Sequence, residues 1–96
     1  MFRFRKSVPL SRDRQGYIYY FSRLYKSLDE SDRTFIKKLC KEAAGENWRA
    51  VLDVVTGKLS CRAACSKHYI SESTLERGIR KYYIAYGKAW AEAESD

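Results

Sequence analysis

The 96-residue sequence predicts an all-α fold of about five helices, the last of them long. Apolar residues recur at three- and four-residue steps along most of the chain, which is the period of an α-helix. Capping residues precede these apolar stripes, and glycines follow two of them. The connections between the stripes are short, and short connections favour helices that pack against one another.

The first 28 residues predict an arm followed by a helix. Residues 1–10 have no sustained period and contain Pro9, so we expect a basic extended arm ahead of a single helical domain at 11–96. Ser11 caps the first helix. The Tyr- and Ile-rich run from Gly16 to Phe21 also suits a strand, but the apolar spacing continues to Leu28, which favours a helix to that point.

Four further helices follow, each with its own start signal. Acidic and hydroxyl residues begin the second helix, a pattern favourable at a helix N-terminus. The predicted bounds are, in order, Asp29 to Gly45, Asn47 to Val55 with Gly57 as the stop, Cys61 to His68 after Ser60, and a long helix from Ser71 or Ser73 that carries apolar residues to Trp90.

The net charge of +7 is unevenly distributed. Residues 1–28 hold seven bases and one acid, a net of +6, and residues 58–88 hold seven bases and two acids, a net of +5. The remaining residues sum to −4. A basic protein favours a polyanionic partner, either nucleic acid or an anionic membrane surface. Two separate basic regions favour a nucleic-acid reader with an arm over uniform non-specific binding.

The length and composition exclude several classes of protein. The chain allows one small domain and leaves no room for a separate cofactor domain. With 45% hydrophobic residues, it is neither collagen-like nor wholly disordered. No Gly-rich phosphate loop, nucleophile motif or pair of catalytic carboxylates is present, and His68 is the single histidine. We therefore predict that the protein is not an enzyme.

A membrane or secreted location is also disfavoured by the sequence. The longest apolar run, residues 17–21, is too short to span a bilayer. The basic start is not followed by the apolar segment of a signal peptide. The cysteines are odd in number, whereas a small secreted domain usually pairs its cysteines. We therefore expect a cytoplasmic protein with reduced thiols.

Residues 60–82 have the features of two helices joined by a tight turn. The small and apolar residues needed at the crossing and in the turn are present: Ala64, Cys65, Ile70, Leu75, Gly78 and Ile79. A hydroxyl-rich start at 71–74 caps the second helix and leaves its N-terminus free to approach a phosphate. This segment resembles the helix-turn-helix of small transposase, resolvase and phage regulator domains. The helix at 47–55 would complete a trihelical core.

The resemblance implies a sequence-specific regulator of transcription or recombination that binds double-stranded DNA. Its size and motif style are typical of proteins from phages, mobile elements or bacteria. On the second helix the implied contacts to the major groove or its flanking phosphates are Ser71, Ser73, Thr74, Arg77, Arg80 and Lys81. Arg62 and Lys67 would face the DNA backbone from the first helix. Arg3, Arg5 and Lys6 of the arm would add a minor-groove or phosphate contact.

Three residues depart from this pattern. Tyr69 stands in the turn where the family most often has Gly, and a bulky residue in the left-handed region costs on the order of 1 kcal/mol, so we expect a reshaped turn. Glu72 and Glu76 place carboxylates on the reading helix, where they repel phosphates. These glutamates favour the alternative reading: a protein–protein inhibitor or adaptor on the same scaffold that targets a nucleic-acid-binding protein.

Two other residue patterns have competing interpretations. Cys61, Cys65 and His68 share a helical face and could bind zinc with Cys40, but free cysteines pack as small hydrophobes, so we predict core packing and no metal or cofactor. The eight tyrosines could stack on exposed bases, although aromatics at helical spacing more often form a core. The end of the long helix could also pair with a second copy in a homodimer.

Overall fold

The computed structural model describes residues 2–95, so Met1 of the predicted arm and Asp96 of the predicted domain lie outside the described residues. Within residues 2–95 the chain forms five α-helices and two 3-10 helices, with no strand. The bounds are α1 Arg12–Arg23, η1 Tyr25–Ser27, α2 Glu30–Ala44, η2 Gly45–Asn47, α3 Trp48–Val55, α4 Cys61–His68 and α5 Glu72–Glu94. The predicted all-α fold with a long last helix is confirmed.

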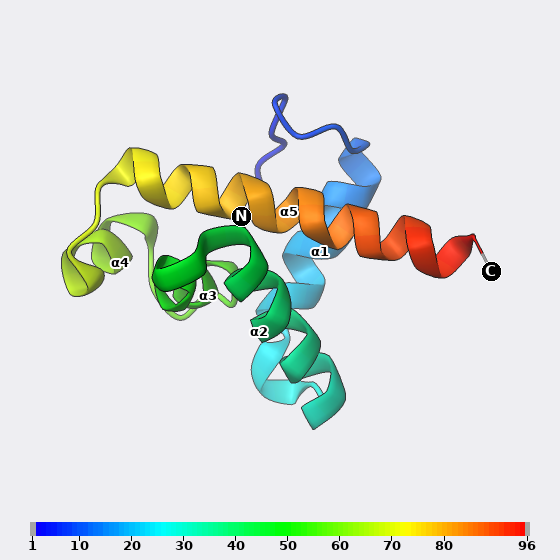
Figure 1. Ribbon diagram of the computed structural model, residues 1–96, viewed down its shortest axis with the longest axis horizontal. Helices are drawn as coiled ribbons and strands as arrows, with labels where there is room; N and C mark the ends of the chain where they lie inside the picture. Colours follow the sequence, from blue (N-terminus) through cyan, green and yellow to red (C-terminus); the bar gives the residue numbers. More distant parts are fainter. Residues whose placement is uncertain (1, 96) are drawn as a thin grey trace.

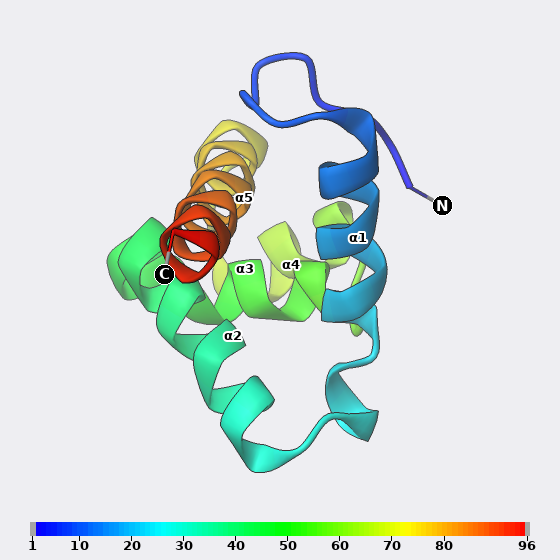
Figure 2. The same cartoon turned by 90° about the vertical axis from the view of Figure 1, so that its right-hand side faces the viewer.

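The long helix α5 is the element around which the others are arranged. It runs along one side of the molecule, with α2, α3 and α4 below it in Figure 1. Its most extensive packing is against α2, and it also contacts α1, α3 and α4. Figure 2 looks nearly along α5 and shows α1 on the opposite side of the molecule, while the N-terminal segment passes over the top from α1 toward α5.

Hydroxyl and carboxylate side chains begin four of the helices where the sequence predicts them. Ser11, Asp29, Ser60 and Ser71 each accept a hydrogen bond from the backbone N–H three residues later, at 2.8 to 3.2 Å. Each cap satisfies one of the N–H groups that a helix start leaves without an intrahelical partner. The local sequence therefore sets where α1, α2, α4 and α5 begin.

The predicted extension of the first helix to Leu28 is wrong. Helix α1 ends at Arg23, and a 3-10 turn follows. Leu24, expected in the apolar stripe, is 54% exposed. The reason lies in the next helix: Asp29 must adopt an extended backbone to cap α2, and Leu28 before it is extended as well, with φ −79° and ψ 157°. The chain has to leave the helical conformation before this cap.

A buried hydrogen bond connects α5 to α1 within the core. The Tyr82 side chain is fully buried, and its hydroxyl lies 2.6 Å from Ser22 Oγ. Ser22 donates its own proton to the Ile18 carbonyl at 2.6 Å, so the Tyr82 hydroxyl donates to Ser22. Burial raises the pKa of Tyr82 well above its ordinary value. The phenol therefore stays neutral and connects the two helices.

The N-terminal segment is bonded to α1 by a buried glutamine. Gln15 Oε1 accepts from the Arg5 N–H at 2.8 Å, and Gln15 Nε2 donates to the carbonyls of Arg5 and Leu10 at 3.0 and 3.1 Å. Val8 is buried, and Leu10 lies against Gly87 of α5, where an added Cβ would come within 2.7 Å of it. These contacts pack residues of the segment onto α1 and α5 rather than leaving them free.

Within residues 2–95 none of the helices combines the length and apolar character needed to cross a membrane.

Candidate nucleic-acid interface

Helices α4 and α5 are joined by a tight turn at Tyr69 and Ile70. Tyr69 has φ 55° and ψ 46°, the left-handed conformation, and its N–H bonds to the Cys65 carbonyl. The Ile70 N–H reaches the same carbonyl at 3.2 Å. The turn is therefore strained by a tyrosine in a position that suits glycine, and it is not reshaped to avoid that strain.

Behind this pair, α5 packs closely on α3. Ala64 of α4, and Leu75 and Ile79 of α5, are buried, as the sequence predicts for the crossing. Gly78 faces α3, and a Cβ at this position would lie 2.8 Å from Val51 Cγ2. The missing side chain thus sets how near the two helices approach, and that approach fixes the orientation of the outer face of α5.

The predicted contact residues on α5 occupy its outer face. Ser71, Ser73, Arg77, Arg80 and Lys81 are exposed, and Thr74 is half-buried. Among the described residues, no carboxylate forms an ion pair with any of these three cations. The face therefore carries three positive charges that the fold itself does not neutralise.

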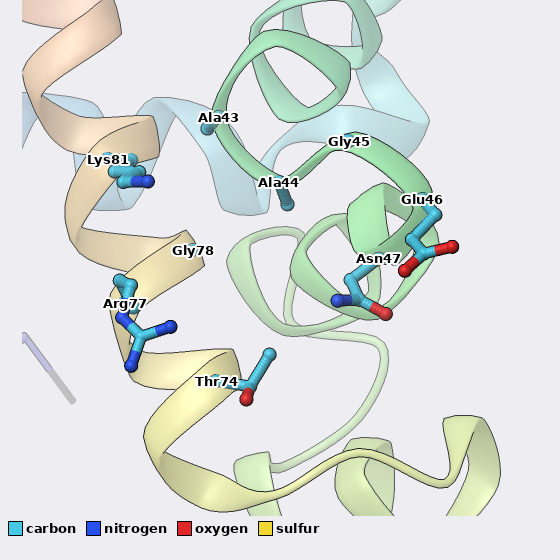
Figure 3. A pocket seen from close by; sticks show the side chains of 9 residues that line it. All are labelled: Ala43, Ala44, Gly45, Glu46, Asn47, Thr74, Arg77, Gly78 and Lys81. Atoms are coloured by element: carbon cyan, nitrogen blue, oxygen red, sulfur yellow. The ribbon is translucent and has the colours of Figure 1, made fainter.

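Part of this face borders a hollow of about 400 Å³. Figure 3 shows Thr74, Arg77 and Lys81 along α5 on one side of the hollow, with Glu46 and Asn47 on the other. The hollow lies between α5 and the junction of α2 with η2. Glu46 thus faces Arg77 and Lys81 across an open space, so the net charge of the residues around this hollow is positive.

Glu76 is paired with the N-terminal segment. The Arg5 Nη1 lies 2.5 Å from Glu76 Oε2, and the Cys61 thiol lies 4.0 Å from Oε1. This carboxylate therefore faces α4 and the segment, and its charge is offset by Arg5. Glu72 remains exposed at the start of the helix. Only one of the two predicted repulsive carboxylates is thus left without a partner among the described residues.

The remaining predicted cations have different surroundings. Arg3, Lys6 and Arg62 are exposed. Lys67 is exposed too, but its Nζ lies 3.4 Å from Asp53 Oδ2 on α3. Arg3 and Arg5 line a shared hollow with Glu76 beside the start of α4. The structure therefore brings part of the N-terminal segment next to the helix pair.

Asp53 is a residue that sequence reasoning missed. It is buried, and its Oδ2 lies 2.8 Å from His68 Nε2. Burial alone would raise the pKa of Asp53, but the hydrogen bonds with His68 and Lys67 lower it below the ordinary value. The available signal was an acid inside the apolar run from Val51 to Val55. This contact connects α3 to the end of α4.

The cysteines and the three tyrosines of α5 pack within the fold. Cys40 is buried, which raises its pKa to about 12, while Cys61 and Cys65 are half-buried. Among residues 2–95, no three His, Cys, Asp or Glu side chains are grouped to hold a metal ion. Tyr82, Tyr83 and Tyr86 lie in the core.

Comparison with known families agrees with this geometry. Residues 48–84 match a family model described as helix-turn-helix, Psq domain. The match starts at the first residue of α3 and ends within α5, so it covers α3, α4 and the first part of α5, which are the helices that the sequence predicts as a trihelical core. Searches of the curated proteins and of the solved structures gave no match.

The fold and the match together define a class: residues 48–84 form a helix-turn-helix domain. Within that class, residues 48–84 are similar to the Psq type. The resemblance predicted from residues 60–82 is thereby confirmed.

Proposed function

We propose that the protein binds duplex DNA in a sequence-specific manner through the outer face of α5 and regulates transcription or recombination. The observation that carries this proposal is the set of three exposed cations, Arg77, Arg80 and Lys81, on the second helix of a helix-turn-helix. Exposed charges with no partner in the fold retain their full attraction for phosphates. The hydroxyls at 71–74 cap the helix start and add polar contacts.

Within this proposal the residues divide between base reading and backbone contact. Arg77 lies at the middle of the exposed face, where it reaches base edges, and a bidentate arginine contact to guanine is the commonest specific one. Ser73 and Thr74 lie on the same part of the helix, and Ser71 is occupied by capping. Arg80 and Lys81 contact the flanking phosphates.

The remaining proposed contacts come from α4 and the N-terminal segment. Arg62 and Lys67 face the DNA backbone beside the groove. Arg3 and Lys6 add phosphate contacts near the start of α4. Arg5 acts indirectly in this arrangement, because its ion pair with Glu76 removes a repulsive charge from the edge of the interface.

Salt-dependent DNA titration tests the proposal. A fluorescently labelled duplex selected from a random pool is titrated with protein at several salt concentrations. The logarithm of the wild-type affinity should fall linearly with the logarithm of the salt concentration. Lys81→Ala should reduce the magnitude of this slope by about 0.9. Arg77→Ala should weaken binding to the selected duplex by about 1–3 kcal/mol relative to binding to random DNA.

Lys26→Ala is the matched control for these variants. It removes one exposed positive charge from η1, which lies at the far end of the molecule from α5 in both views (Figures 1 and 2). Binding by this variant should equal that of the wild type. Absence of binding by the wild type at about 50 mM salt, where non-specific affinity is strong, would remove the DNA-binding proposal.

A protein-binding module is the second candidate, favoured by an aromatic hollow away from the reading face. Tyr17, Phe35, Tyr86 and Trp90 line an opening of about 280 Å³ near the end of α5, and Tyr17 is 51% exposed. Such a surface suits an inhibitor or adaptor contact, or a homodimer. Sedimentation of the isolated protein distinguishes the homodimer, and Trp90→Ala should abolish either association while sparing DNA binding.

We also propose a cytoplasmic location in a bacterium, or in a cell that carries the encoding phage or mobile element. The three free cysteines support a reducing compartment. Labelling of thiols in intact cells, followed by denaturation in the presence of the same reagent so that buried Cys40 also reacts, tests this: all three should be found reduced, and an intermolecular disulfide would argue against it.

A further inference from the structure

Tyr69 combines two features that the fold does not require. Its side chain is 94% exposed, the largest exposure among the large hydrophobic residues described. It is also the one non-glycine residue with a positive φ in the described part of the chain. A left-handed conformation is rare for a bulky residue, and strained positions of this kind cluster at functional sites.

The other residues with a positive φ in the described part of the chain are glycines. Gly45 has φ 55° and Gly57 has φ 78°, and both follow helices. The turn at Tyr69 needs the left-handed backbone so that Ile70 can return to the Cys65 carbonyl. Glycine would provide that conformation without strain, whereas tyrosine lowers the equilibrium constant for folding by on the order of tenfold. The backbone requirement therefore explains the turn and leaves the tyrosine ring unexplained.

The position of the ring indicates what it contacts. Tyr69 lies between Lys67 at the end of α4 and Ser71 at the cap of α5. When the start of a reading helix enters the major groove, the turn before it comes beside the adjacent sugar-phosphate backbone. A phenol has a hydrogen-bond donor at the end of an apolar ring, and tyrosine is among the residues that bind phosphate oxygens.

We propose that Tyr69 is a DNA-contact residue, whose hydroxyl donates to a backbone phosphate and whose ring packs on the neighbouring sugar. This inference rests on the proposed DNA binding and adds a neutral contact to the cationic ones. A neutral donor displaces no condensed counterion. Loss of the contact therefore lowers affinity without changing its dependence on salt, unlike loss of Lys67 or Arg62.

The test uses the full chain with Tyr69→Gly and Tyr69→Phe. Tyr69→Gly should weaken duplex binding about five- to tenfold at an unchanged salt slope, and its Tm should stay the same or rise by about 0–4 °C because the strain is relieved. Tyr69→Phe keeps the ring and loses the donor, so it should weaken binding about two- to threefold. The control is Tyr20→Ala, which removes a 59% exposed tyrosine from α1 and should bind normally.

The possible outcomes separate this inference from the proposed function. If the wild type binds no DNA, the proposed function fails, and the contact with it. If the wild type binds and both Tyr69 variants bind equally well, only the contact is refuted. A reduced salt slope or a lower Tm in Tyr69→Gly would also refute it, because the loss would then come from displaced cations or from folding.

Discussion

Substitution of Gly78 by alanine tests whether the close approach of α5 to α3 is as tight as the structure indicates. An added Cβ would lie 2.8 Å from Val51 Cγ2 and 3.4 Å from Ala44 Cβ. Non-bonded carbons pack at about 3.5–4.0 Å, so the two helices would have to separate by roughly 1 Å. Val51 cannot easily rotate away, because a β-branched side chain in a helix has one strongly preferred rotamer.

A second glycine provides the scale for the expected effect. At Gly16 in α1 the nearest atom to an added Cβ is in Phe2, at 3.8 Å, which is ordinary contact. Gly16→Ala therefore gains only the helix preference of alanine, about 0.5–1 kcal/mol. Gly78→Ala has the same gain and an overpacking cost of about 1–3 kcal/mol. The difference between the two variants isolates the overpacking cost, because the helix preference cancels.

Urea unfolding followed by circular dichroism measures both variants under one set of conditions. Gly78→Ala should unfold with a free energy lower than that of Gly16→Ala by about 1–3 kcal/mol and with an unchanged m-value. Repeating Gly78→Ala in a Val51→Ala background should remove most of the difference, since the clashing methyl is gone. Equal stabilities of Gly78→Ala and Gly16→Ala would refute the close packing described here.

Three further predictions concern the buried polar groups and thiols. Burial acts to raise the pKa of Asp53, but its bonds to His68 and Lys67 leave the pKa below 3.8, so the carboxylate stabilises the fold above about pH 4 and this contribution is lost as the pH falls through the lowered pKa. In urea titrations the free energy of unfolding of the wild type should exceed that of Asp53→Asn by about 1–3 kcal/mol at neutral pH, and the difference should shrink as the pH is lowered through the lowered pKa of Asp53; a constant difference would contradict this. Cys40, whose pKa burial raises to about 12, should react with an aromatic disulfide reagent only when denaturant is added. Gln15→Ala leaves backbone groups of the N-terminal segment without partners, so it should lower stability by about 1–3 kcal/mol and speed tryptic cleavage after Lys6; an unchanged cleavage rate would count against the packed segment.

The helix starts were predictable because the signals that set them are local. A serine or aspartate cap acts on an N–H only three residues away, so Ser11, Asp29, Ser60 and Ser71 are visible in the sequence itself. The outer face of α5 was predictable for a similar reason, since helical periodicity separates the buried Leu75 and its neighbours from the exposed cations.

The features that were not predicted depend on contacts between distant residues. Glu76 and Arg5 are 71 residues apart in the sequence, and no local pattern pairs them. Gln15 is a polar residue in an apolar stripe, and its role becomes clear only when residues 5–10 fold back onto α1.

The end of α1 at Arg23 was missed for a different, local reason. The apolar period continued past Arg23, while the cap of the next helix required an extended chain.

The contacts that support α5 lie largely outside the segment that matches the helix-turn-helix family. The most extensive packing of α5 is against α2, and the Tyr82 hydroxyl is bonded to Ser22 of α1, yet the matched segment spans only 48–84. Transplanting the outer face of α5 into another protein would therefore require α1 and α2 to move with it. A peptide of the matched segment alone would expose the apolar side of α5 and lose the contacts that orient its outer face, where Arg77 lies.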